Sequence, residues 1–143
     1  MLALVTMPVS YKLLPEKQLG YVAFYGSFSG VDMIEASRFS LTDPSWCSLP
    51  MIIWDGREIT GLEFDLASVH RMADLISAHG AQLPPSRHAI IVRREQDWIL
   101  GRLVLYLIRL KKRELRLFRT MEEGAAWLGV RVDCSDLVSK VGS

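Results

Sequence analysis

The sequence has few of the residues from which metal and redox sites are built. It contains two cysteines and three histidines in 143 residues. Cys47 and Cys134 lie far apart and form no C-x-x-C pattern, so we expect two free thiols. His70, His79 and His88 share no ligand spacing, and zinc needs three or four converging ligands. We therefore predict no metal and no cofactor, and surface or hydrogen-bonded histidines.

The sequence also lacks long apolar runs, repeats and low-complexity tracts. The longest apolar stretch, residues 98–110, contains Gly101, Arg102 and Arg109. It is too short and too charged to span a bilayer. The N-terminal residues lack the basic region of a secretory signal. We expect one cytoplasmic domain over residues 1–143, with its core at about 9–129 and no transmembrane segment.

A strong charge of either sign is absent, since the net charge is +1. The two parts of the chain nevertheless differ: residues 1–86 have 5 basic and 9 acidic side chains, and residues 87–143 have 12 basic and 7 acidic ones. A basic cluster comprises Arg109, Lys111, Lys112, Arg113, Arg116 and Arg119. It is best interpreted as a solvated turn. Nucleic acid is not an expected partner, because no exposed aromatic platform accompanies the cluster.

The sequence does contain short apolar runs that alternate with segments whose apolar residues recur at helical spacing. Strands are expected at 9–14, 19–25, 51–54, 89–92 and 115–118. Helices are expected from Ser29 to about Asp43, from about Asp65 to Ala78, from about Glu95 to Lys112, and from Thr120 to Gly129. This order predicts an α/β fold with a mixed, mostly parallel five-stranded sheet, flanking helices and an N-terminal β-hairpin.

The closing strand and helix carry the strongest local signals. Thr120 and Glu123 have the spacing of a capping box, and Gly129 is a helix stop. Trp127 near the end of this helix is predicted to be structural. The segment offers no nucleophile with a base, so the chain is not expected to be an enzyme.

The helix predicted at 95–112 is apolar on two faces. One face comprises Ile99, Leu100, Leu103, Leu107 and Leu110, and the other comprises Gly101, Val104, Leu105 and Ile108. A helix outside a sheet needs only one apolar face. The second face is predicted as an interface, which makes a homodimer the expected assembly. Burial within the chain and cover by a lipid-like ligand stay open as alternatives.

Two short segments could hold a ligand. Asp55 and Arg57 follow the strand at 51–54 and could clamp an anion at the carboxyl edge of the sheet. The alternative is that they pair with each other or with the backbone. Residues 26–30 join a strand to a helix start, where Ser27 could contribute to a phosphate cradle. A plain capped turn is favoured there, because no P-loop or dinucleotide motif is present.

Four segments together resemble the SpoIIAA-like group of STAS and SEC14-type domains of bacteria. They are residues 51–57 (MIIWDGR), 89–92 (AIIV), 101–106 (GRLVLY) and 117–129 (LFRTMEEGAAWLG). The resemblance covers about residues 9–129. It implies the α/β fold predicted above. It also implies either a protein partner, which the sequence does not identify, or a lipid-like ligand.

The resemblance leads to two hypotheses of function. STAS domains act through protein contacts, so the first is a non-catalytic cytoplasmic binding or regulatory module. Their Asp-Ser-Ser-Gly motif is replaced here by residues 58–62 (EITGL), so no phosphorylation switch is expected. SEC14-type relatives bind apolar molecules, so the alternative is a carrier with Phe28, Trp54 and Tyr106 as pocket aromatics. An apolar cavity would distinguish the two, because a packed core favours the first.

Overall fold

The sheet of this protein is built on five strands in sequence order. The computed structural model describes residues 9–63, 65–108 and 112–137, without the side chain of Cys134. The strands are β1 (Val9–Leu14), β2 (Leu19–Ser29), β3 (Met51–Glu63), β4 (Ser86–Ile91) and β5 (Arg113–Phe118). The helices are α1 (Gly30–Thr42), α2 (Leu66–Gly80), α3 (Glu95–Leu107), α4 (Met121–Leu128) and α5 (Cys134–Leu137), with a 3-10 turn η1 (Pro15–Lys17).

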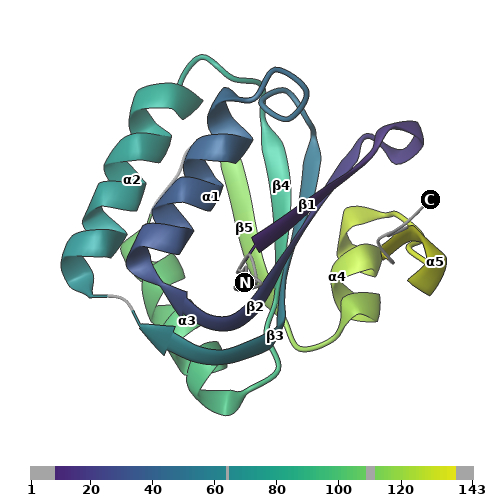
Figure 1. Cartoon of the computed structure of the whole chain (residues 1–143). Coiled ribbons are helices and arrows are strands. Elements are labelled where there is room, and N and C mark those ends of the chain that lie inside the picture. The colour runs from purple at the N-terminus through teal and green to yellow at the C-terminus, as the bar shows by residue number, and fades with distance from the viewer. Residues whose placement is uncertain (1–8, 64, 109–111, 138–143) are drawn as a thin grey trace, which may run out of the picture.

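The sheet is mixed and mostly parallel, as the alternation of strands and helices predicts. Its order is β1-β2-β3-β4-β5 (Figure 1). β1 pairs antiparallel with β2 through η1, and each later pair is parallel. A crossover helix separates each parallel pair, as such connections require. The fold class and the N-terminal hairpin are confirmed.

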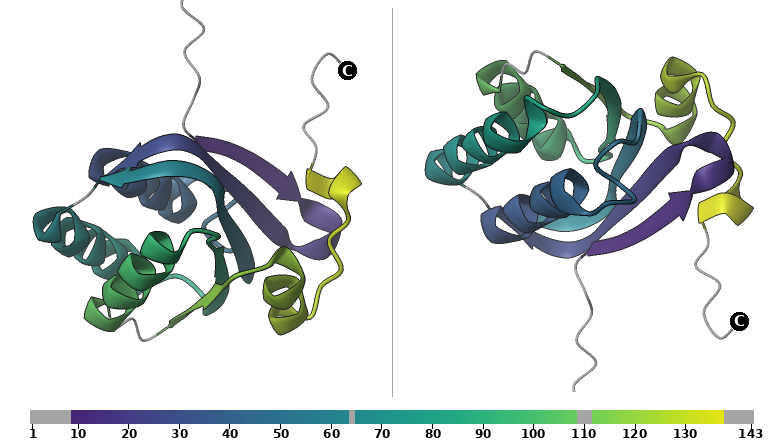
Figure 2. Two further views of the ribbon diagram at one scale, coloured as in Figure 1. Left: turned by 90° about the horizontal axis from the view of Figure 1, so that it is seen from below. Right: turned by 90° about the horizontal axis from the view of Figure 1, so that it is seen from above.

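Helices cover the sheet unequally. α1, α2 and α3 lie on one face, and the short helices α4 and α5 lie on the other (Figures 1 and 2). Alternate residues of a strand point to opposite faces. Ile52 therefore belongs to a cluster with Ala36 of α1, whereas Ile53 packs with Met121 and Leu128 of α4. Two cores result, one on each side of the sheet.

β2 and β3 extend well beyond the strand ends predicted from the sequence. They stay paired from Leu19 with Met51 to Ser29 with Glu63. Residues 26–30 therefore do not break β2, and Asp55 and Arg57 lie inside β3. The register shifts twice, between Ala23 and Tyr25 and beside Gly26, whose φ of 68° suits glycine. These irregularities accompany a bend that carries both strands under α1 (Figure 1).

The helix starts follow the predicted caps. Ser29 accepts a hydrogen bond from the Asp32 amide, and the Asp32 carboxylate accepts one from the Ser29 amide, which is a complete capping box. Asp65 caps α2. Thr120 caps α4, and Gly129 ends it in the left-handed conformation. Local hydrogen bonding thus sets the boundaries that the sequence predicts.

α3 corrects the prediction of an interface. It ends at Leu107 rather than at Lys112, and residues 109–111 lie outside the described part of the chain, so Leu110 of the other predicted face does too. Val104 and Ile108 are buried and pack with Val69 and Met72 of α2. A Cβ at Gly101 would lie 3.0 Å from the Leu117 side chain. The face predicted to meet another subunit is therefore turned toward the chain's own sheet and α2.

The C-terminal segment packs against the sheet beyond residue 129. Val130, Val132 and Leu137 contact the core cluster on the α4 side. Lys17 of η1 pairs with Asp136 of α5 at 2.8 Å. Packing therefore continues past the core end expected at about residue 129. No helix among the described residues is long and apolar enough to cross a membrane.

Candidate apolar ligand-binding site

An apolar cavity lies between the sheet and the three helices on its larger side. Its volume is about 180 Å³. Its lining includes Phe24, Phe28 and Trp54 from the strands and Met33, Met72 and Leu105 from the helices. Protein interiors are close-packed and hold few voids larger than a water molecule. A void of this size in the main core is therefore a departure from close packing.

Aromatic rings form one wall of the cavity. Phe24 and Phe28 pack at 4.4 Å between ring centroids, and Trp54 stacks on Phe24 at 6.0 Å. Phe28 and Trp54, two of the predicted pocket aromatics, are thus brought together. Tyr106 is 69% exposed and does not line the cavity. It corrects the prediction, because position 106 lies on the outer side of α3, away from Val104.

Ser27 and the pair of Asp55 and Arg57 also lie elsewhere. Ser27 is exposed, since it alternates with the buried Phe28 along β2. Arg57 donates to both carboxylate oxygens of Asp55, from Nε at 2.9 Å and from Nη2 at 2.8 Å. The Tyr21 hydroxyl donates to the same carboxylate, and Tyr21 belongs to the core on the α4 side. These groups satisfy one another on the face opposite the cavity.

The electrostatics of this cluster agree with a structural pair. Burial raises the pKa of Asp55, but the hydrogen bonds from Arg57 and Tyr21 outweigh it and lower the pKa overall. The Asp55 carboxylate likewise raises the pKa of Arg57. Burial, together with the hydrogen bond to Asp55, raises the pKa of Tyr21. All three groups keep their ordinary charges near neutral pH, so the cluster is a closed ion pair.

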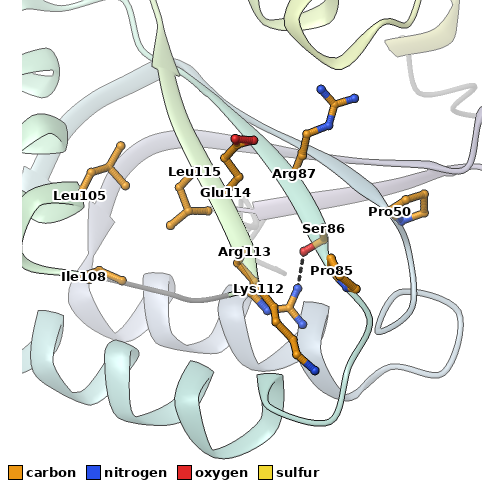
Figure 3. A pocket seen from close by; sticks show the side chains of 10 residues that line it. All are labelled: Pro50, Pro85, Ser86, Arg87, Leu105, Ile108, Lys112, Arg113, Glu114 and Leu115. Carbon is orange, nitrogen blue, oxygen red and sulfur yellow. Dashed lines mark hydrogen bonds between the residues drawn. The ribbon is translucent and has the colours of Figure 1, made fainter.

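A chain of polar groups enters the cavity wall from β3, β4 and β5. Trp54 Nε1 donates to His88 Nδ1 at 2.9 Å, and His88 Nε2 lies 2.8 Å from the Ser86 hydroxyl. Arg113 Nη1 donates to the same Ser86 oxygen (Figure 3). Burial, with a smaller contribution from the Arg113 charge, lowers the pKa of His88 to about 3. His88 is therefore neutral at physiological pH.

The direction of these bonds decides what Ser86 and His88 can do. A neutral imidazole has one donor and one acceptor nitrogen. Because Nδ1 accepts from Trp54, Nε2 carries the proton and donates to Ser86. A serine nucleophile needs the reverse arrangement, in which the imidazole accepts the hydroxyl proton. This pair is therefore not arranged to activate Ser86.

A buried ion pair supports the cavity at the start of α3. Asp97 is 1% exposed and lines the cavity. Arg94 donates to its two oxygens from Nε at 3.0 Å and Nη2 at 3.1 Å. Arg94 also donates to the Thr60 carbonyl of β3. The pair therefore joins α3 to the extended part of β3, and both of its charges are satisfied.

Sequence reasoning missed His88 and Arg113, which line the cavity, and Ser86, which lines an adjoining cleft. It assigned Arg113 to a solvated turn and expected His88 only to lie at the surface or to be hydrogen-bonded, and the structure shows it hydrogen-bonded. Arg113 instead begins β5 with buried guanidinium nitrogens, and His88 is buried within β4. A signal was present, because Ser86 and His88 are two residues apart and share a strand face. Arg113 is adjacent to them only through the β4–β5 register, which pairs it with Ser86.

An open cleft adjoins the cavity at the amino ends of β4 and β5 (Figure 3). Its volume is about 770 Å³. Leu105, Ile108, Arg113 and Leu115 line both the cleft and the apolar cavity. Among the described residues, no cluster of three histidine, cysteine or carboxylate side chains could hold a metal ion. The described site therefore combines an apolar chamber with a cleft lined by Arg87, Lys112 and Arg113, of which Arg113 also lines the chamber.

Comparison with known proteins identifies the fold. No family model matches the chain, and no curated protein matches it. A solved structure of an uncharacterized protein of the DUF3478 family from Shewanella loihica PV-4, described as having a SpoIIAA-like fold, matches with a TM-score of 0.52. The match covers 84% of this chain and 91% of that one at 17% identity. This chain therefore has a SpoIIAA-like fold, as its motifs suggest.

Proposed function

We propose that this protein binds a small apolar molecule in the cavity between the sheet and α1, α2 and α3. The observation that carries the proposal is the cavity itself, with its volume of about 180 Å³ and its aromatic wall. An apolar cavity of roughly 150 Å³ stays dry and binds benzene. The present cavity therefore suits an apolar group of roughly six to eight carbon atoms.

The walls have the properties of a preformed site. Trp54 is held by its hydrogen bond to His88, and Asp97 is held by Arg94. Most polar atoms beside the cavity thus have hydrogen-bond partners within the chain. An apolar ligand could therefore bind without breaking these hydrogen bonds. Preformed, mainly apolar pockets with a few placed polar groups are typical of ligand sites. This supports small-molecule binding over the alternative of a fully packed core.

A pair of tryptophan substitutions tests the proposal. Leu105→Trp on α3 would fill the cavity, and Leu66→Trp is the matched control at an exposed leucine of α2 that does not line the cavity. Octan-1-ol is the probe, followed by calorimetric titration and by the rise of Tm with probe concentration. We expect binding by the wild type and by Leu66→Trp, and at least tenfold weaker binding by Leu105→Trp. Absence of binding to the wild type would overturn the proposal.

We propose second that the outer face of α3 contacts a second copy of the chain. Ile99, Leu103 and Leu107 are 62%, 54% and 43% exposed. Adjacent exposed apolar side chains of this kind mark contact sites. Ile99 and Leu103 lie one helical turn apart, so an antiparallel two-fold pairing of α3 would place each against the other.

Sedimentation at micromolar concentration tests this second proposal. The wild type should sediment as a dimer, and the variant carrying Ile99→Glu and Leu103→Glu should sediment as a monomer that keeps the circular dichroism spectrum of the folded chain, with a lower Tm because dimerisation no longer stabilises it. The same change at two exposed positions of another helix, Leu66→Glu with Ala67→Glu on α2, is the control and should leave the dimer intact. A monomeric wild type would contradict the proposal without affecting the cavity proposal.

A further inference from the structure

The outer edge of β5 has no partner strand within the described part of the chain. β5 pairs with β4 on one side, and in Figure 2 it forms one border of the sheet, with no described helix or strand beyond it. A strand edge of this kind presents unpaired N–H and C=O groups that can pair with a strand of another chain. The edge is therefore a place where a second copy can join the sheet.

The ladder between β4 and β5 determines which backbone groups of β5 point outward. The Ser86 amide donates to the Lys112 carbonyl at 3.0 Å, and the Val92 amide donates to the Phe118 carbonyl at 3.0 Å. The register between these two bonds is continuous, so the even-numbered residues of β5 direct their backbone groups toward β4. The odd-numbered residues, with Leu115 at their centre, direct their N–H and C=O groups toward the open edge.

Two exposed side chains of opposite charge flank Leu115. Glu114 and Arg116 lie on the same face of β5, and the Arg116 guanidinium lies 5.6 Å from the centroid of the Trp127 ring. If two β5 strands pair antiparallel about a two-fold axis at Leu115, each Glu114 is opposite Arg116 of the other copy. These are non-hydrogen-bonded pairs, whose Cα atoms lie roughly 4.5 Å apart. Opposite charges in such positions stabilise strand pairing.

Other pairings of an edge with itself are less favourable. An axis at residue 114 places Glu114 opposite itself, and an axis at residue 116 places Arg116 opposite itself, and like charges directly opposite each other destabilise a sheet. The other edge strand, β1, contains Lys12 and no acidic residue, so no register there opposes charges of different sign. Lysine on an edge strand is typical of edges that avoid pairing. The charge pattern therefore favours β5 and the register centred on Leu115.

We propose that two copies of this chain join through β5, antiparallel about a two-fold axis at Leu115, so that their sheets become one continuous sheet. The proposal rests on the second-copy contact proposed above for α3 and adds the strand edge and the register of the same dimer. α3 packs on β5, since a Cβ at Gly101 would lie 3.0 Å from the Leu117 side chain. The same axis therefore places the two α3 helices antiparallel on one face of the joined sheet.

An exchange of the two charges tests the register. Sedimentation equilibrium would give the dissociation constant of the dimer for the wild type, for Glu114→Arg, for Arg116→Glu and for the variant that carries both changes. Glu58→Arg is the matched control, because Glu58 is an exposed glutamate of β3 and its reversal changes the net charge as Glu114→Arg does. Melting curves would verify that each variant folds.

We expect each single reversal on β5 to weaken the dimer at least tenfold, because both symmetric pairs change from opposite to like charges. The double variant restores opposite charges with the positions exchanged, so its dissociation constant should return to within about threefold of the wild type. Glu58→Arg should leave the dissociation constant unchanged. Arg116→Glu also removes the contact with Trp127, so Glu114→Arg serves as the test of the edge if Arg116→Glu does not fold.

Cysteine cross-linking tests the same register without a charge reversal. Glu114→Cys and Arg116→Cys would be made separately in a chain that carries Cys47→Ser and Cys134→Ser. A Cα separation of roughly 4.5 Å is within the reach of a disulfide. Under oxidation a mixture of the two variants should therefore give a disulfide-linked dimer, whereas neither variant should link to itself.

The possible failures can be told apart. If the wild type is a monomer at micromolar concentration, both the α3 contact and the pairing of β5 are wrong. If the wild type is a dimer but the reversals on β5 act no more strongly than Glu58→Arg, the pairing of β5 is wrong and the α3 contact stands. If the exchange of charges does not restore affinity, or if the mixed cysteine variants do not link, the register about Leu115 is wrong.

Discussion

Trp54 and His88 lie stacked on neighbouring strands, with an interplanar angle of 15° and 6.1 Å between ring centroids. The indole Nε1 donates to the imidazole Nδ1 at 2.9 Å. One hydrogen bond thus orients an aromatic wall of the cavity and selects the tautomer of the histidine behind it. Because Nε2 must then carry the proton, the same contact orients Ser86 and, through it, Arg113.

The burial of His88 makes stability depend on pH. Its pKa is about 3 in the folded protein and about 6.5 when unfolded, so below 6.5 only the unfolded chain gains the proton. The free energy of unfolding should therefore fall as the pH drops from about 6.5 toward 3.

Between about pH 7 and pH 5, the protonation of His88 in the unfolded chain should lower the free energy of unfolding by about 2 kcal/mol. Urea denaturation at both pH values would compare the wild type with His88→Asn, whose amide oxygen can still accept from Trp54. The variant should lose about 2 kcal/mol less than the wild type over this interval. Equal losses in both proteins would show that His88 is not the group responsible.

The ion pair of Asp55 and Arg57 should contribute to stability rather than to binding. Asp55→Ala leaves Arg57 and Tyr21 without their acceptor, but the Arg57 side chain is 37% exposed and can be hydrated. We expect Asp55→Ala to lower the free energy of unfolding by about 2 kcal/mol, and Tyr21→Phe to lower it by about 1 kcal/mol. Chemical denaturation measures both. Octan-1-ol affinity should stay unchanged, and a large loss of affinity would contradict the separation of this cluster from the cavity.

Gly20 is required by the ring of Trp46. A Cβ at position 20 would lie 2.4 Å from a ring carbon of this buried tryptophan. Gly20→Ala should therefore destabilise the protein by about 1–3 kcal/mol. Gly61→Ala is the control in a neighbouring strand, since its Cβ would meet only the Ser27 hydroxyl at 3.7 Å. Thermal unfolding of the two variants should separate them, and equal Tm values would refute the clash.

Trp127 should contribute more to stability than the segment that follows it. Its ring packs on Phe118 at 5.6 Å between centroids, and Arg87 lies over it at 5.3 Å. Because the ring is half-buried, Trp127→Ala should cost about 2–3 kcal/mol, below the range for a fully buried tryptophan. Removing residues 133–143 should cost less, although Leu137 and Asp136 make contacts. Chemical denaturation would measure the free energy of unfolding of both variants. A larger loss for the deletion than for Trp127→Ala would contradict this ranking.

Much of the fold could be predicted from the sequence because its signals are local. Ser29, Asp65 and Thr120 cap helices through bonds to amides three residues away, so the cap and its partner appear together in the chain. Segments predicted as strands alternate along the chain with segments predicted as helices. That alternation restricts the sheet to mostly parallel strand pairs. Phe28 and Trp54 are expected as pocket aromatics from the resemblance to SEC14-type domains, and both line the cavity, although Phe28 lies in a segment that the sequence predicts as a break after the strand.

The tertiary structure alone decided the rest of the site. β3 continues through Asp55 and Arg57 because β2 offers it a partner along its whole length, which no local signal encodes. The helix α3 is apolar on both sides, so only packing against Leu117 and α2 determined which side is inside. Arg113 reaches Ser86 across 27 residues of sequence. A basic residue in a run of basic residues indicates a solvated turn, and only the register of β4 and β5 buries this one at the cavity opening.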